Sequence, residues 1–227
     1  MPFNSRSKPN NRWQAGLTQS WMAYRMSIFM KYTLQSLLKQ TNQSFTALIR
    51  YAEATEDAIV PLLNSFDPLP GNIRFIPRRS KVKEQIIRTA GVEDLYLVHL
   101  DCDDMYQRSF IQQLHDFKPR KKTRALINQH GYVYDSVNHR MAAVTMPSPP
   151  FYTYIYKAEE YLQGTRYKAQ GHRNVIRSFE HEILTDKKNR NFMAVVHERN
   201  KLNQKLLTRY KFERDRSIVD TILRKFK

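Results

Sequence analysis

Three aspartates stand within four positions of the chain, in the segment Leu100-Asp101-Cys102-Asp103-Asp104. Asp101 and Asp103 are two residues apart, so in an extended chain their carboxylates leave on the same side, and Asp104 follows at a turn. Like charges this close repel each other unless a cation lies between them or one of them is protonated. Mg²⁺ and Mn²⁺ prefer oxygen ligands and typically pair one or two carboxylates with substrate phosphates. The segment therefore predicts a metal-bridged diphosphate site.

Other kinds of site fit this segment less well. A calcium-binding EF-hand loop needs a glycine at its sixth position and an acid at its twelfth, where this chain has Tyr106 and Gln112. The glycine-rich phosphate loop G-x-x-x-x-G-K-[ST] is absent from the sequence. The remaining alternative is that the aspartates cap a helix that starts near Met105, where the helix dipole favours carboxylates. One aspartate is enough for a cap, so three favour the metal site.

The net charge of +17 over 227 residues indicates an anionic partner. Nucleic acid, an anionic membrane surface, a phosphorylated ligand and an acidic polymer all fit that charge. Any one basic cluster is also explained as a solvated loop or helix face, but their sum is harder to explain in that way. The clusters lie at residues 78–83, 119–124, 187–190 and 224–227.

The composition is that of a folded protein, with 41% hydrophobic and 12% aromatic residues. The single cysteine, Cys102, excludes an internal disulfide, fits a reducing compartment and is expected to be a small buried apolar residue. We find no apolar run of the roughly 18 residues that a membrane span requires and no signal-peptide pattern. The expected location is the cytoplasm, with basic clusters able to contact the inner face of an anionic membrane.

Strands and helices are predicted to alternate through the first half of the chain. This alternation is typical of a parallel sheet covered by helices, in which ligands bind beyond the carboxyl ends of the strands. The third strand is almost entirely apolar, which predicts burial on both faces, and the three aspartates follow it directly. The expected helices are residues 21–40, 55–64, 81–90 and 105–117, and the expected strands are residues 44–51, 72–77 and 95–100.

The second half changes character. Alternating residues around Gly131 and Asn138-His139 predict antiparallel strands, and residues 146–164 form a proline-kinked aromatic stretch that enters a short helix. A further strand ends at His197, and the tail from residue 200 has helical spacing. With no internal repeat or linker, we expect one domain over residues 1–227, with halves at residues 1–118 and 119–227.

The segment "LDCDDMY" after an apolar strand resembles the D-x-D segment of nucleotide-sugar glycosyltransferases of the GT-A fold. The upstream passage "YTLQSLLKQTNQSFTALIRY" resembles the helix-to-strand passage of bacterial family A enzymes. "SPPFYTYIY" and "VVHERNKLN" are similar to small Bacillus-type glycosyltransferases near the rhamnosyltransferases. The resemblance spans roughly residues 3–203. The upstream match is carried by Arg25, Phe29, Ser36, Leu37, Gln40, Thr41 and Phe45.

This resemblance implies an α/β fold of the GT-A type, with a mixed sheet flanked by helices. The first half would bind a UDP- or dTDP-linked sugar, and the second a glycan or lipid-linked acceptor of a surface polysaccharide. By the same analogy Asp101 approaches the ribose or sugar, while Asp103 and Asp104 hold Mn²⁺ or Mg²⁺, with His197 as a third metal or phosphate contact. The metal would stabilise the charge that develops on the departing diphosphate.

Two further roles follow from the resemblance. An inverting transfer needs a base for the acceptor hydroxyl, and His181 and Glu182 are the candidates, with Asp135 and His172 behind them. The family's base-reading acid follows the second strand, where this chain has Ala52 and then Glu53, so Glu53 is the expected nucleotide contact. Only "MPFNSR" remains of the family's first strand, which predicts a shortened one.

Two rival functions and one open role accompany this interpretation. The net charge also fits a nucleic-acid-binding protein without catalysis, although no recognised binding motif is present and the acids would repel a nucleic-acid backbone. The shortened start also fits an inactive sugar-binding GT-A domain. The aromatic residues Phe151, Tyr152, Tyr154 and Tyr156 can either stack on an acceptor sugar or pack in the core.

Overall fold

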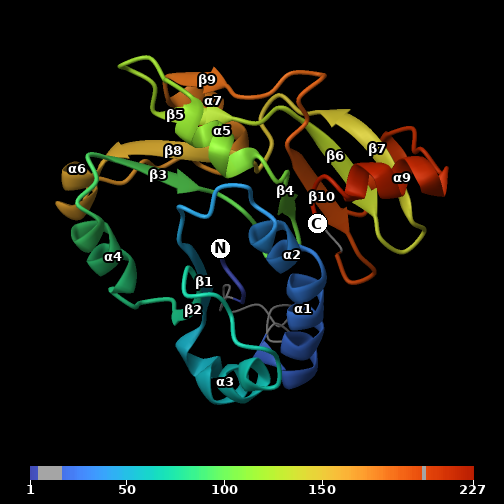
Figure 1. Cartoon of the computed structure of the whole chain (residues 1–227), viewed down its shortest axis with the longest axis horizontal. Helices are drawn as coiled ribbons and strands as arrows, with labels where there is room; N and C mark the ends of the chain where they lie inside the picture. The colour runs from blue at the N-terminus through green and yellow to red at the C-terminus, as the bar shows by residue number, and fades with distance from the viewer. Residues whose placement is uncertain (5–16, 201–202) are drawn as a thin grey trace.

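The structure is a computed structural model, and it describes residues 1–4, 17–200 and 203–227. The chain forms mixed β-sheets flanked by helices, which confirms the predicted α/β class (Figure 1). In the described part of the chain, no helix is long and apolar enough to cross a membrane.

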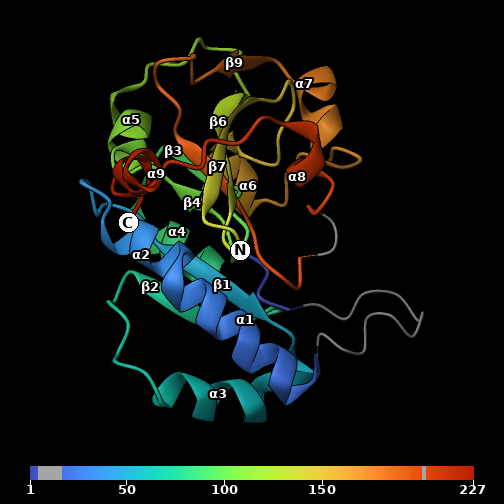
Figure 2. The same cartoon turned by 90° about the vertical axis from the view of Figure 1, so that its right-hand side faces the viewer.

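A small parallel sheet lies beside the first helices. Strands β1 (Ala47–Tyr51) and β2 (Ile73–Pro77) pair in parallel, and α3 (Glu56–Asn64) connects them. The predicted shortened first strand is present as one parallel bridge between Pro2 and Arg50. The predicted long helix is divided at Tyr32, whose backbone (φ −119°, ψ −72°) separates α1 (Gln19–Lys31) from α2 (Thr33–Leu38). Helices α1 and α3 lie along this small sheet (Figure 2).

Two four-stranded sheets make up the rest of the molecule, and both are mixed. In the first, β10 pairs in parallel with β6 and antiparallel with β4, while β7 pairs antiparallel with β6. In the second, β8 pairs antiparallel with β3 and β5, while β9 pairs in parallel with β5. The strands are β4 (Met105–Tyr106), β10 (Phe192–Val196), β6 (His130–Asp135), β7 (Arg140–Thr145), β3 (Asp94–Val98), β8 (Tyr152–Lys157), β5 (Ala125–Ile127) and β9 (His181–Ile183).

The remaining helices are short and lie between these strands or in the tail. Gly91 ends α4 in the left-handed conformation (φ 59°), which confirms the predicted stop. These elements are α4 (Val82–Ala90), α5 (Phe110–Asp116), α6 (Ala158–Leu162), α7 (Val175–Ser178), α8 (Leu206–Arg209), α9 (Arg216–Leu223) and the 3-10 helices η2 (Glu53–Thr55) and η3 (His172–Asn174).

Strand β3 differs from the prediction in both partner and burial. It does not extend the parallel pair but lies antiparallel to β8 from the second half, with Asp94 opposite Lys157 and Val98 opposite Thr153. Its residues are partly or fully exposed rather than buried on both faces. The alternation of strands and helices predicted a local parallel partner, whereas the actual partner is more than 50 residues away in the chain, where periodicity gives no information about pairing.

The helix predicted from Met105 begins only at Phe110, since Met105 and Tyr106 pair with Met193 and Phe192 of β10. This pairing removes the expected helix start beside the aspartates. The capping explanation of the acidic segment is therefore wrong. The three aspartates instead lie in a loop between two strands of different sheets.

The largest group of buried apolar residues takes members from both halves of the chain, including Phe29, Ile49, Phe151 and Phe192. The rings of Phe151 and Phe192 stack with centroids 4.1 Å apart. Cys102 is fully buried in the same group, and burial raises the pKa of its thiol to about 12, so it is the inert apolar residue that was predicted. One core thus supports both sides of the aspartate loop.

We expect Gly131→Ala to destabilise the fold. A Cβ atom at Gly131 would lie 2.5 Å from the ring of Phe192, which is itself fixed by Phe151. The resulting overpacking should lower the free energy of unfolding, measured in urea, by about 1–3 kcal/mol. Gly71→Ala is the matched control, because a Cβ there meets nothing within 4 Å. Equal stability of the two variants would contradict the close packing described here.

Candidate functional site

The aspartate loop follows the carboxyl end of β3, and hydrogen bonds to its backbone carbonyls and to that of His99 fix its shape. The Asp104 amide donates to the Asp101 carbonyl (3.2 Å), which closes the turn. The Thr33 hydroxyl of α2 donates to the Asp104 carbonyl (2.9 Å), and the Tyr106 hydroxyl donates to the His99 carbonyl (3.0 Å). The loop therefore presents its carboxylates from a fixed backbone.

Asp104 anchors the loop to the neighbouring sheet. Its Oδ1 accepts a hydrogen bond from the Val195 amide of β10 (3.0 Å), and the residue is only 4% exposed. Burial, and then the nearby carboxylates of Asp103 and Asp101, raise the pKa of Asp104 well above its usual range. One oxygen of this predicted metal ligand is thus engaged by backbone.

Asp103 faces a cationic group instead. The Arg25 guanidinium of α1 lies 3.3 Å from Asp103 Oδ2, and Asn200 donates to the same oxygen (3.3 Å). Burial alone would raise the pKa of Asp103, but the His197 imidazole and the Arg25 guanidinium outweigh burial and hold the pKa below its usual value. Asp103, at 6% exposure, is therefore the ionised member of the buried pair.

His197, directly after β10, completes this cluster. Its Nε2 lies 3.4 Å from Asp103 Oδ2, while its Nδ1 lies 2.9 Å from the Tyr24 hydroxyl. Nε2 is buried and has no hydrogen-bond partner among the described residues. A buried polar atom without a partner is costly unless a further group satisfies it. The structure thus brings two of the predicted metal residues, Asp103 and His197, into contact.

The donor set at Asp103 and His197 fits a divalent cation. Adjacent ligands of an octahedral Mg²⁺ or Mn²⁺ lie about 3 Å apart, close to the 3.4 Å between Asp103 Oδ2 and His197 Nε2. Among residues 1–4, 17–200 and 203–227, no three His, Cys, Asp or Glu side chains converge on one metal position. A cation here would need phosphate oxygens and water as its other ligands, as is usual for Mg²⁺ at phosphate sites.

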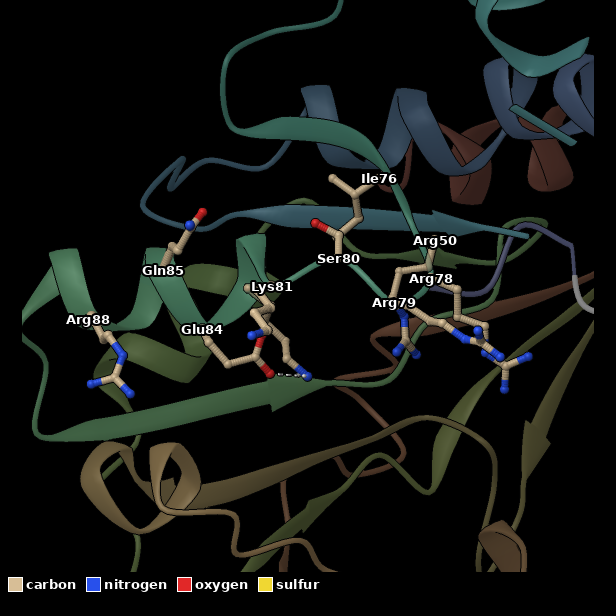
Figure 3. Close-up of a pocket in the computed structure, with 10 residues that line it drawn as sticks. Arg50, Ile76, Arg78, Arg79, Ser80, Lys81, Glu84, Gln85 and Arg88 are labelled. Carbon is tan, nitrogen blue, oxygen red and sulfur yellow. Dashed lines mark ion pairs between the residues drawn. The ribbon is translucent and has the colours of Figure 1, made fainter. Parts of the chain in front are cut away.

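A basic pocket opens where β1 and β2 end. Its cavity of about 500 Å³ is lined by cationic side chains and one carboxylate, Glu84. Figure 3 shows these side chains pointing to the same side, with Arg50, Arg78 and Arg79 together and Arg88 further along α4. The size is that of a small-molecule site. The cationic lining consists of Arg50, Arg78, Arg79, Lys81, Lys83 and Arg88.

Glu53 lies at the border of this pocket, whereas Asp101 does not line it. Glu53 Oε1 accepts a hydrogen bond from the backbone amide of Arg79 (2.7 Å). Asp101, which is partly exposed, starts the aspartate loop and is not among the described residues that line this pocket.

The predicted base residues His181 and Glu182 lie elsewhere. They belong to β9, at the opposite end of the molecule from α1 in both views (Figures 1 and 2). The Glu182 carboxylate accepts hydrogen bonds from the Thr123 hydroxyl and the Arg120 amide, and these bonds lower its pKa. The structure does not bring these residues together with Asp103, so their assignment as the base has no geometric support.

The reserve candidate Asp135 is a structural residue. It is fully buried at the end of β6, and its carboxylate accepts hydrogen bonds from Asn138 Nδ2 (2.8 Å), Arg140 Nε (2.7 Å) and the amides of Val137 and Asn138. Burial would raise the pKa of Asp135, but these hydrogen bonds hold it below its usual value. They fix the turn between β6 and β7.

Most of the aromatic strand packs in the core. Core packing was one of its two predicted roles, the other being to stack on an acceptor sugar. Phe151, Tyr154 and Tyr156 are buried, whereas Tyr152 is partly exposed and stacks on His99 (centroids 4.9 Å apart). Only Tyr152 of this group remains accessible to a ligand.

Sequence reasoning did not assign Arg25, Tyr24 or Asn200 to the site. The sequence did contain a signal that could have assigned Arg25 to the site, because Arg25 belongs to the passage that resembles family A enzymes. Tyr24 carried none, since one tyrosine on an amphipathic helix has no spacing that marks a site. Asn200 comes three residues after His197 and is placed by the turn after β10.

The comparisons with known proteins address the family. Residues 6–208 match the model of the family described as "Putative rhamnosyl transferase". The chain belongs to this family. Membership supports an enzyme of the glycosyltransferase class, and it confirms at that level the resemblance seen in the sequence.

No curated protein matches the chain. Among solved structures, a similar chain is that of 4-diphosphocytidyl-2C-methyl-D-erythritol synthase from Anaerococcus prevotii DSM 20548. Its sequence identity is 12%, the match covers 91% of this chain and 89% of that chain, and the TM-score is 0.31. The assignment to the family depends on the family match and not on this similarity.

We expect Asp135→Asn to lower stability at neutral pH. A carboxyl group with a pKa lower in the folded than in the unfolded protein stabilises the fold above its unfolded pKa, and this contribution is lost as the pH falls through the folded pKa. The variant should lose about 1–3 kcal/mol of unfolding free energy near pH 7. Its deficit should shrink below about pH 4, the usual range of an aspartate.

Urea unfolding of both proteins across this pH range measures the effect. Asp67→Asn, at an exposed turn position, is the matched control and should change stability little at any pH. A deficit of Asp135→Asn that does not change with pH would contradict an ionised, hydrogen-bonded Asp135.

Proposed function

We propose that the protein is a GT-A-type glycosyltransferase that moves a sugar from a UDP- or dTDP-linked donor to an acceptor glycan or lipid-linked acceptor. The observation that carries this proposal is the buried Asp103–His197 pair, and the basic pocket at the ends of β1 and β2 supports it. Family membership gives the reaction class. In this proposal the Asp103–His197 pair binds the cation, and the basic pocket binds the diphosphate.

The basic pocket is proposed to hold the nucleotide diphosphate. Arginine donates two parallel hydrogen bonds to phosphate oxygens, so the adjacent Arg78 and Arg79 suit such a group. Glu53, beside Arg79, is positioned to accept from the nucleoside. Asp101, partly exposed at the start of the loop, is proposed to accept a hydrogen bond from a ribose or sugar hydroxyl.

Asp103 and His197 are the proposed metal ligands, for Mn²⁺ or Mg²⁺. When His197 Nδ1 carries the ring proton, it donates to the Tyr24 hydroxyl and leaves the lone pair of Nε2 facing Asp103. A bound cation supplies Lewis-acid stabilisation of the charge on the leaving diphosphate. Arg25 balances the charge of Asp103 and can donate to a phosphate oxygen. Asp104 is proposed to hold the loop on β10 through Oδ1, which leaves Oδ2 as its candidate ligand atom for the cation.

We expect UDP or dTDP to bind more tightly with Mn²⁺ than without it, and Asp103→Asn to abolish this difference. The amide cannot supply the anionic ligand, so metal-dependent affinity should fall by at least about 10- to 100-fold. Isothermal titration calorimetry measures it. Asp67→Asn makes the same chemical change at an exposed position and should leave binding unchanged.

Two results would refute the proposal. One is an absence of nucleotide binding to the wild-type protein with metal, together with tight, steeply salt-dependent binding of DNA or RNA, which would favour the nucleic-acid-binding alternative. The other is nucleotide binding that Mn²⁺ does not change.

We further expect the double variant Arg78→Ala, Arg79→Ala to bind UDP or dTDP at least about tenfold more weakly, since each charge-assisted hydrogen bond contributes about 1.5–3 kcal/mol. The loss should occur with and without Mn²⁺, because these arginines contact phosphate directly. Arg214→Ala, Arg216→Ala removes the same charge from exposed tail positions and is the control. Equal losses in the two double variants would mean that only net charge matters.

A further inference from the structure

A second basic pocket lies in the acceptor half of the molecule. Its cavity of about 420 Å³ is lined by Gln170, Gly171, His172, Arg173, Asn174 and Arg177, from the loop before η3 to α7. Two arginines, one histidine and two amides are hydrogen-bond donors, and no carboxylate of the described residues lines the cavity. Such a lining is suited to an oxyanion and not to a neutral sugar alone.

The backbone around this pocket is fixed rather than a free loop. Gly171 takes a positive φ of 80°, and the Asn174 amide donates to its carbonyl (3.1 Å). The Asn174 side chain donates to the Gln170 carbonyl (2.6 Å), and Val175 is buried in the core beneath. The two arginines are therefore carried on a turn with a defined shape.

A chain of contacts connects this pocket to the aspartate loop. The Ser148 hydroxyl donates to the His172 carbonyl (2.7 Å), and two residues later the Pro150 carbonyl contacts His99 Nδ1 (2.7 Å). His99 precedes Asp101 by two residues. Burial, Arg173 and His99 lower the pKa of His172, whereas Asp101 raises it. The charge of Asp101 therefore acts on His172, in agreement with these contacts. These contacts connect the pocket to the segment that leads into the aspartate loop.

We infer that the pocket formed by residues 170–174 and Arg177 binds an oxyanion of the acceptor, so that the acceptor is a phosphorylated or carboxylate-bearing sugar. The identification of the bound molecule as the acceptor rests on the proposed function. The binding of an anion in this pocket does not depend on it. Arg173 and Arg177 hold the anionic group by charge-assisted hydrogen bonds. The acceptor hydroxyl then faces Asp101, where the sugar of the donor is placed.

Three ligands with one sugar scaffold test the inference: glucose 1-phosphate, glucuronate and methyl glucoside. Each is titrated into protein saturated with UDP and Mg²⁺, so that the donor pocket is filled. The signals are the heat of binding and the nuclear magnetic resonance of the His172 ring. At least one of the two anions should bind and shift His172, and the neutral glucoside should bind at least about tenfold more weakly. The anion that binds more tightly identifies the source of the oxyanion.

The double variant Arg173→Ala, Arg177→Ala should weaken anion binding at least about tenfold and leave UDP binding unchanged. Arg214→Ala, Arg216→Ala, which removes two exposed arginines elsewhere, should change neither. If UDP does not bind, the same titrations are made without UDP in the Arg78→Ala, Arg79→Ala variant. This variant removes two cationic side chains of the donor pocket, so that anion binding reports on the second pocket. Anion binding without UDP binding would refute the proposed function alone.

Any of three results would overturn the inference. The anions fail to bind at about 10 mM, the neutral glucoside binds as tightly as they do, or the Arg173 and Arg177 double variant binds them as well as the wild-type protein does. Each result is distinct from a failure of UDP to bind, which concerns only the donor pocket.

Discussion

The structure depends on the need to neutralise two adjacent carboxylates that are almost fully buried. A buried charge is costly unless it is paired and hydrogen-bonded. Asp104 meets this condition through the Val195 amide of β10, and Asp103 through Arg25 of α1 and the His197 imidazole. These contacts join the first helix, the loop after β3 and the last strand, which are far apart in the chain.

The same requirement separates the roles of the two carboxylates. Asp104 is bound to backbone and its pKa rises, whereas the pKa of Asp103 stays below its usual value beside the Arg25 guanidinium and the His197 imidazole. Two buried carboxylates thus lie side by side in a molecule that carries a net charge of +17. Some of the basic residues line two pockets, whose donor groups are suited to anions.

The core explains why this arrangement holds its shape. Strand β3 leads into the aspartate loop and pairs with β8 from the second half, while β10 carries His197 and packs Phe192 against Phe151. The absence of a Cβ at Gly131 lets the Phe192 ring approach β6. Both ends of the Asp103–His197 pair are therefore supported by packing that crosses the predicted boundary between the halves.

The sequence by itself determined the family, the α/β class, most helices and strands of the first half, and the acidic loop, because these depend on local spacing and on residues adjacent in the chain. It also indicated His197, at the end of an apolar strand. The tertiary structure decided the partner of β3, the strand at Met105 and Tyr106, and the placement of His181 and Glu182 on a distant strand. It also brought Arg25 and Tyr24 to Asp103 and His197. Those features depend on contacts between residues far apart in the chain, which periodicity and motif spacing do not encode.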